Sequence, residues 1–417
     1  MASAGLLRIA ARNLRKNLRR TLITGSAIAG GLALLIWTGN LQEGSYSSLI
    51  RRGVSTMAGH VVVQAEGYQA EQDMHMLVEG AESTEGEVQA ALSAVAPDAR
   101  VASRVLVQGL LQSTRNTSGV ALVGIEPSAE ATVSDWHEKV VDGGEWLADD
   151  DTQGVLLGEK LAESLEVELG DKVVLMAQGE DEVVHRLFRV RGLLRTGVAD
   201  IDGFMALATL PAAQAALERP GAATMVTIHL DDPALVPEVR TAVAGAMGER
   251  KVEVLPWQEA LPEMYQFTVL DRQSAQAMFF IIGVIVAMGV LNTVLMSVME
   301  RVREFGVMLA LGTRPRQIFR IILYEGIVLG FLATSVGLAL GILTTLPGMH
   351  WGIDFGAMMG DNVEVAGVTM DAMVYPEWDW GGTFGSCAIA WLMTVLAALW
   401  PAWHASRLEP VQAMRQV

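Results

Sequence analysis

The sequence is poor in several features that mark common classes of protein. It contains a single cysteine, Cys387, which lies within an uncharged apolar run. A folded domain in this chain therefore has to be stabilised by its hydrophobic core and not by disulfides. No G-x-x-x-x-G-K-[ST] phosphate-binding loop is present, and the histidines show no metal-ligand spacing. No Ser-His-Asp or Cys-His pattern and no basic surface for nucleic acid is visible. We therefore expect no catalytic site, no metal site, no bound cofactor and no nucleic-acid partner.

Long apolar runs, in contrast, are abundant. Hydrophobic residues make up 51% of the chain, and the mean hydropathy is +0.34. Crossing the ~30 Å hydrocarbon core of a bilayer takes about 20 helical residues. Four uncharged stretches are long enough, at 21–42, 273–299, 326–353 and 380–406. They predict transmembrane helices at 21–42, 273–299, 318–346 and 380–404. A cleavable signal peptide is the alternative for the first, but no small-x-small cleavage site ends that run cleanly.

The charges are distributed unevenly around a net charge of −17. Residues 38–277 hold 37 acidic and 17 basic side chains, and residues 347–379 hold six acidic side chains and no Lys or Arg. The remaining 13 Lys and Arg all lie next to the ends of predicted helices, within 8–20, 301–320 and 407–415. Short basic loops stay in the cytoplasm. We therefore expect both termini on the cytoplasmic side.

The fold class that follows is a membrane protein of four transmembrane α-helices with a large extracytoplasmic α+β domain between the first and second. Strands are predicted at 60–65, 101–112, 120–124, 154–157, 172–177, 183–194 and 224–230. The domain, residues 43–272, is long enough for two lobes, with an inner lobe near 120–210. Residues 1–20 are typical of a cytoplasmic amphipathic helix, 347–379 of an extracytoplasmic loop, and 405–417 of a cytoplasmic tail.

Residues 300–317, between the second and third predicted helices, have a pattern of their own. After a charged turn, apolar residues form a helical stripe, namely Phe305, Met308, Leu309 and Leu311. Gly312 suits a left-handed helix end, and Thr313 with Pro315 suits the start of the next helix. We therefore expect a short cytoplasmic helix, whose exposed stripe is covered by a protein partner or by the bilayer surface.

Two motifs carry a resemblance to a known family. They are "ERVREFGVMLALGTRPRQI" at 300–318 and "PAWHASRLEPVQAMR" at 401–415. With one span, a large external domain and three further spans, the chain resembles the FtsX-like permeases of ABC transporters, which include the macrolide-exporter and lipoprotein-releasing types. The stretch "GVLLGEKLAESLEVELGDKVVL" at 154–175 also resembles a recurrent element of their external domains.

The resemblance implies that this chain is a non-catalytic subunit. Such permeases work as dimers with an ATPase, whose ATP-driven closure is transmitted through the membrane helices to the external domains. Since no phosphate loop is present, a separate ATPase in two copies would bind ATP and Mg²⁺. The family's coupling helix maps onto residues that would contact it: Glu300, Arg301, Arg303, Glu304 and Gly312. Glu325, just inside the third span, matches an acidic position of the family and needs Arg320 or a neighbouring helix as partner.

Segments 57–69 and 193–217 look more like the lipoprotein-releasing type. That likeness implies a place in the bacterial inner membrane, a second permease protomer that is identical or paralogous, and extraction of lipoproteins or other amphipathic cargo toward a periplasmic carrier. Residues expected to contact acyl chains or membrane lipids, or else to form a hydrophobic hinge, are Met264, Phe267 and Leu270. Small residues on the first two spans permit close helix packing beside a cargo cavity: Gly25, Ala27, Gly30, Gly31, Gly283, Ala287 and Gly289.

Other functions remain open at this point. Members of the family also export peptides or small molecules, and some relatives transport nothing but activate an envelope hydrolase with the same stroke. A membrane-anchored enzyme is a further class, but no motif supports it.

Overall fold

The computed structural model describes residues 12, 18–179, 182–196, 199–355, 363–365, 368–370 and 373–407. Most of the helix predicted for 1–20, residues 356–362 of the predicted outer loop and residues 408–417 of the predicted tail lie outside this description. The chain divides into two compact units. The first comprises Met1–Ser47, Leu270–Asp354 and Met373–Val417, and the second Ser48–Val269 and Phe355–Ala372.

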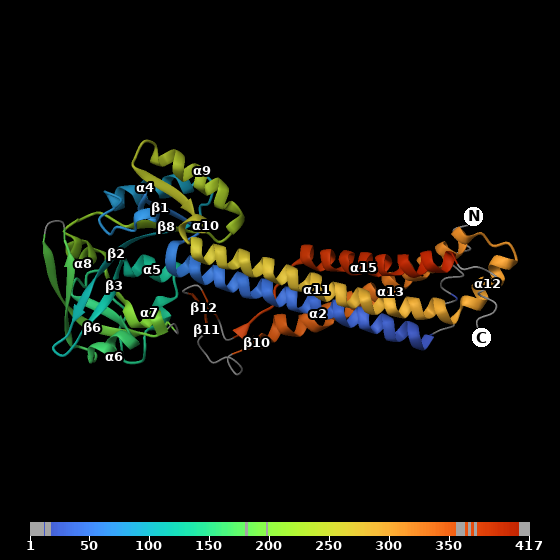
Figure 1. Cartoon of the computed structure of the whole chain (residues 1–417). Helices are drawn as coiled ribbons and strands as arrows, with labels where there is room; N and C mark the ends of the chain where they lie inside the picture. Colours follow the sequence, from blue (N-terminus) through green and yellow to red (C-terminus); the bar gives the residue numbers. More distant parts are fainter. Residues whose placement is uncertain are drawn as a thin grey trace. The chain divides into compact units, whose positions relative to one another are not determined.

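The first unit is a bundle of long apolar helices that run side by side (Figure 1). They are α2 (Leu18–Gly53), α11 (Pro262–Glu300), α13 (Pro315–Trp351) and α15 (Trp380–Ser406). Among the described residues, these four are long and apolar enough to cross a membrane. A short helix, α12 (Val302–Ala310), lies at one end of the bundle, and the two-residue strands β10 (Ile353–Asp354) and β13 (Met373–Val374) lie at the other. The predicted fold class is confirmed.

Close packing in the bundle depends on glycines of α13. A Cβ at Gly337 would come within 3.0 Å of the Ala29 carbonyl oxygen on α2, and one at Gly326 within 2.6 Å of Ala398 on α15. A Cβ at Gly326 would overlap its neighbour and one at Gly337 would be unusually tight, so these glycines permit the close approach of the helices. We expected this role for small residues of the first two spans. It is confirmed for Gly31 of α2, where a Cβ would come within 3.3 Å of Val286 on α11. A Cβ added at Gly30, Gly283 or Gly289 would meet no described atom within 4 Å, so these three glycines do not mediate close packing within this chain.

Aromatic side chains mark both ends of the bundle. The rings of Trp378 and Trp380 stack where α15 begins, with their centroids 5.0 Å apart. Trp351, at the end of α13, is 71% exposed. Trp400 and Trp403 are about half exposed near the other end of α15. At 1.5 Å per residue, Trp380 and Trp403 are separated by ~35 Å, which matches a bilayer core of ~30 Å with its interfaces.

The second unit is an α+β domain built on nine strands. They are β1 (Val61–Ala65), β2 (Arg100–Gln112), β3 (Thr117–Ile125), β4 (Gly154–Gly158), β5 (Lys172–Gln178), β6 (Val183–Leu194), β7 (Met205–Thr209), β8 (Met225–His229) and β9 (Val252–Pro256). The strand order is β3-β7-β4-β6-β5-β2-β8-β1-β9, and β3 also pairs with β2. Six strands, β2 to β7, therefore close into a barrel, and the other three extend from the first half of β2. A separate two-stranded hairpin joins β11 (Val363–Val365) to β12 (Val368–Met370).

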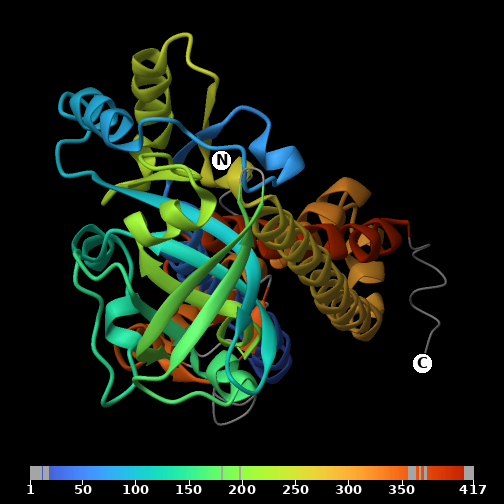
Figure 2. The same cartoon turned by 90° about the vertical axis from the view of Figure 1, so that its left-hand side faces the viewer.

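Each of these two lobes has its own core. The barrel buries Val105, Leu122, Val155 and Leu175, with α6 (Glu159–Leu165) and α8 (Leu210–Leu217) packed against it. The sheet of β1, β8, β9 and the start of β2 is covered by α4 (Ala81–Leu92) and α9 (Val236–Met247), which lie side by side in Figure 2. The smaller helices are α3 (Tyr68–Glu71), α5 (Pro127–Val133), α7 (Ala199–Phe204) and α10 (Trp257–Ala260). The barrel begins before the inner lobe predicted near 120–210 because β2 belongs to both lobes.

Arg104 stands where β2 passes from one sheet to the other. It is the last residue of β2 that pairs with β8, and its neighbour Val105 pairs with β3. Its guanidinium donates to both oxygens of Glu130 and to three backbone carbonyls, those of Ser55, Thr56 and Met57. Both charged side chains are almost fully buried. Removing one partner of such a pair costs about 3–5 kcal/mol, so this pair holds the junction of the two lobes.

Candidate functional site

The segment between α11 and α13 folds as the short helix α12. It ends before Gly312, whose φ of +94° is readily adopted only by glycine. The next helix, α13, begins at Pro315, and the residue before its first turn is Arg314 and not Thr313. The predicted short helix and its left-handed glycine are confirmed.

The apolar stripe of this segment faces the chain's own bundle. Phe305 is 1% exposed, and it packs with residues of α11, α13 and α15: Val298, Ile318, Ile322, Ala402 and Ala405. Met308 and Leu309 lie partly buried against the same cluster. The prediction of an exposed stripe was wrong for these three residues, because an amphipathic pattern does not tell which body covers its apolar face. The large apolar side chains of this segment that are exposed are Val307 and Leu311, at 42% and 82%.

Arg301 lies at the turn between α11 and α12 and joins three side chains. Its guanidinium donates to Glu304 at 3.0 Å and to Glu325 of α13 at 3.1 Å, and it lies 5.1 Å from the centroid of the Phe305 ring. The side chains of Arg301 and Glu325 are 16% and 15% exposed, whereas that of Glu304 is 57% exposed. Burial opposes the charge on Arg301, but the Glu325 and Glu304 carboxylates outweigh it and raise the pKa of Arg301.

Glu325 does not pair with Arg320, which was one of its two expected partners. Arg320 is exposed, and five helical residues place it about 140° around the α13 axis from Glu325, so it lies on another face. The observed partner is Arg301. The other residues expected to contact an ATPase are exposed, and they are Glu300, Arg303, Glu304 and Gly312.

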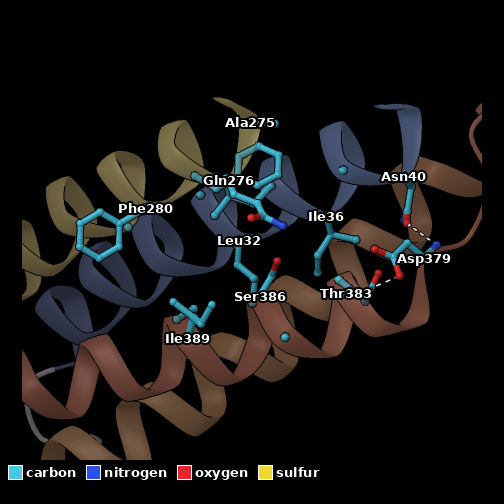
Figure 3. A pocket seen from close by; sticks show the side chains of 18 of the residues that line it. Leu32, Ile36, Asn40, Ala275, Gln276, Phe280, Asp379, Thr383, Ser386 and Ile389 are labelled. Carbon is cyan, nitrogen blue, oxygen red and sulfur yellow. Dashed lines mark hydrogen bonds between the residues drawn. The ribbon is translucent and has the colours of Figure 1, made fainter. Parts of the chain in front are cut away.

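A cavity of about 590 Å³ lies among α2, α11 and α15, in the part of the bundle away from α12 (Figure 3). Its walls are largely apolar: Leu32 and Ile36 of α2, Phe279 and Phe280 of α11, and Ile389 and Met393 of α15. Along α2 the lining runs from Ile28 to Tyr46, or ~27 Å at 1.5 Å per residue. The volume is within the range of about 300–1,000 Å³ that is typical of small-molecule sites. A long hydrocarbon chain matches this shape and lining.

Polar side chains gather at the end of the cavity that is farthest from α12. Arg272 of α11 donates to Glu43 of α2 at 2.8 Å, and Tyr46 of α2 donates to Asp271 of α11 at 2.5 Å. The Asp379 N–H, just before α15, donates to the side-chain oxygen of Asn40 on α2 at 3.1 Å (Figure 3). These bonds tie α2 to both neighbouring helices. The cavity is therefore amphipathic, with one polar end and a long apolar body.

Comparison with known proteins places the chain in a family. Residues 277–410 match the FtsX-like permease C-terminal family, and residues 21–246 match the MacB-like periplasmic core domain. The chain is an FtsX-like permease. It is therefore a non-catalytic, multi-pass membrane subunit of an ABC transporter with a periplasmic domain, and the predicted family is confirmed.

Relatives of the permease include lipoprotein-releasing systems. It is 26% identical to the lipoprotein-releasing system transmembrane protein LolC of Neisseria meningitidis, over 95% of this chain and 94% of that protein. It is also 26% identical to the lipoprotein-releasing system transmembrane protein LolE of Haemophilus influenzae, over 73% of this chain and 74% of that protein. The crystal structure of the periplasmic region of MacB from Actinobacillus actinomycetemcomitans aligns with a TM-score of 0.36 at 15% identity, over 54% of this chain and 95% of that one.

The residues expected to contact acyl chains do not line the cavity of the permease. Met264 is 2% exposed and packs with Leu49, Val54 and Trp257. Phe267 and Leu270 are 37% and 63% exposed, and their contact with cargo or lipid stays a prediction. Three of the small residues expected beside a cavity do line it, namely Gly31, Gly283 and Ala287. Three polar residues that interrupt the apolar runs also line the cavity, namely Asn40, Gln276 and Ser386, and they could have indicated its position in the sequence.

Replacing Glu325 by Ala should loosen α12, because the change leaves the largely buried Arg301 without its better shielded partner. We expect the amides of 302–310 to exchange with deuterium at least about tenfold faster in the full-length Glu325→Ala permease than in the wild type. Glu304→Ala is the matched control. It removes the exposed partner of the same arginine, so exchange should rise by about threefold at most. Equal protection of α12 in the wild type and in Glu325→Ala would contradict the assigned role of the pair.

Proposed function

We propose that this permease uses ATP hydrolysis by a separate ATPase to extract lipid-anchored proteins from the inner membrane and release them toward a periplasmic carrier. The amphipathic cavity among α2, α11 and α15 is the observation that carries the proposal, because it can hold an acyl chain with its polar group at one end. Similarity to LolC along almost the whole chain supports the same cargo class.

The orientation that we propose places α12 and both termini in the cytoplasm. Its support is the charge distribution, because the basic residues flank α12 and the chain ends, whereas residues 38–277 are strongly acidic. In this orientation the polar end of the cavity lies at the periplasmic side, which is where the anchor of a lipoprotein would enter. A carrier and a second permease protomer, identical or paralogous, would complete the assembly.

The ATPase would dock on the exposed face of α12. Leu311 and Val307 are exposed apolar side chains, and Arg303, Arg314 and Arg316, which are near them in the sequence, are exposed as well. Exposed apolar side chains together with charged ones are typical of a binding surface. The opposite face of α12 packs through Phe305 on α11, α13 and α15, so a push on α12 would reach all three helices. ATP and Mg²⁺ would be held by two copies of the partner ATPase.

Leu311→Glu should prevent the ATPase from binding, because the change puts a carboxylate at the centre of the proposed contact. We expect copurification of the ATPase with the full-length permease in mild detergent to fall at least tenfold. Leu169→Glu is the control. It adds the same charge at a leucine that is 43% exposed in the periplasmic domain, and it should leave copurification unchanged. Undiminished ATPase binding to Leu311→Glu would rule out this docking face.

A second variant tests the cargo. Gly283 lines the cavity and has open space around its Cβ position, so Gly283→Leu fills the cavity without a clash inside the chain. We expect ATP-driven release of a lipoprotein from proteoliposomes to drop about tenfold while ATPase activity persists. Gly289→Leu is matched, because Gly289 lies on the same helix with the same open space but does not line the cavity. Normal release by Gly283→Leu would contradict the role of the cavity as the cargo site. If the wild type released no lipoprotein, a role as regulator of an envelope hydrolase would be favoured.

A further inference from the structure

Asn40 is unusual among the residues that line the cavity, because it is polar and only 1% exposed. Its side-chain oxygen accepts the Asp379 N–H at 3.1 Å, and its backbone oxygen accepts the Glu377 N–H at 3.0 Å. A backbone N–H can only donate, so the first bond fixes which side-chain atom is oxygen and which is nitrogen. The amide is therefore held in one orientation.

The nitrogen of this amide has no hydrogen-bond partner among the residues that the structure describes. It carries two N–H groups in a residue that faces a largely apolar cavity (Figure 3). Buried donors are almost always paired, since an unpaired one loses its water without replacement. Asn40 therefore holds an unsatisfied donor in the wall of the cavity, near its polar end, where almost none of its surface is accessible to water.

The surroundings decide which acceptor suits this donor. Two carboxylates line the same end, those of Glu43 and Asp379, and the one Arg that lines it, Arg272, is already paired with Glu43 at 2.8 Å. A phosphate or a free carboxylate would be repelled by these acids. A neutral carbonyl oxygen is not repelled by these acids. If it is attached to a hydrocarbon chain, the chain can occupy the apolar body of the cavity.

We propose that Asn40 recognises the ester carbonyl of an acyl chain held in the cavity. The inference rests on the proposed function, and it names the chemical group that is recognised and the residue that donates a hydrogen bond to it. Acyl esters occur both in the lipid anchor of a lipoprotein and in membrane phospholipids. The two sources share this chemistry, and the experiment separates them.

The test compares ligands that differ only in the carbonyl. Fluorescent diacylglyceryl-cysteine lipopeptide and its dialkyl ether analogue are bound to the full-length permease in detergent micelles, and a phosphatidylglycerol pair, ester and ether, forms the second arm. We expect wild-type permease to bind the ester lipopeptide about tenfold more tightly than the ether, the ratio for one buried hydrogen bond whose donor is otherwise left unpaired. Discrimination in the phosphatidylglycerol arm alone would support the role of Asn40 with membrane lipid as the source.

Two variants assign the effect to Asn40. Asn40→Leu keeps the size of the side chain but removes the donor, so the ester-to-ether ratio should fall to about one. Thr24→Val is the matched control. Thr24 lies on the same helix, is 4% exposed and has a hydroxyl without a partner among the described residues, but it does not line the cavity. It should keep the tenfold ratio.

Failure of this inference and failure of the proposed function give different results. Equal binding of ester and ether by the wild type in both arms would overturn the role of Asn40 and leave the cavity as an acyl-chain site. The wild-type ratio needs no variant, so this outcome is decisive even if Asn40→Leu does not fold. Binding of none of the four ligands would overturn both the inference and the proposed cargo site.

Discussion

The ion pair between Arg301 and Glu325 is the contact on which the working of the bundle depends. A carboxylate on a membrane helix is costly unless it is paired, and a largely buried guanidinium needs its partner for the same reason. By satisfying both, the pair fixes the turn between α11 and α12 to α13. The buried ring of Phe305 adds contacts with α15 through Ala402 and Ala405. The short helix therefore belongs to the bundle and cannot act as a separate flap.

The same constraint shapes the opposite end of the bundle. There, polar groups on α2 meet partners on α11 and before α15, through Glu43 with Arg272, Tyr46 with Asp271, and Asn40 with Asp379. Each bond satisfies a group that lipid could not. Together they tie three helices to one another at the polar end of the cavity that lies between them. The bundle thus has the short helix α12 at one end and an amphipathic cavity toward the other, joined by continuous helices.

Much of this architecture could be predicted from the sequence, because transmembrane helices depend on the length of uncharged runs and not on tertiary contacts. Helix α12, Gly312 and most strands of the α+β domain were also predicted correctly. The short strands β7 and β9 were missed. All five residues of β7 are buried, so its sequence shows no alternation of polar and apolar residues, and β9 is equally short.

The candidate site was harder to predict, because its parts come from distant segments. Arg301 and Glu325 are 24 positions apart, and nothing in their spacing shows that they meet. The stripe at Phe305 predicted an apolar face correctly but not the body that covers it. Met264 was expected either to contact acyl chains or to form a hydrophobic hinge, and only the structure shows that it is buried against Trp257. The cavity depends on which residues three helices bring together, and this requires the packing geometry.

The central claim is that movement of α12 reaches the cavity through its packing on α11 and α15, and that the Arg301–Glu325 pair holds α12 in place for this. Pulsed electron paramagnetic resonance tests it most directly, with spin labels at Gly39→Cys on α2 and Gly385→Cys on α15 in a Cys387→Ser background. Both glycines line the cavity and have open space around their Cβ positions. In the complex with its ATPase, ATP should shift the distance between the labels, and Glu325→Ala should abolish the shift. An unchanged distance on addition of ATP, or the same shift in Glu325→Ala, would contradict the claim.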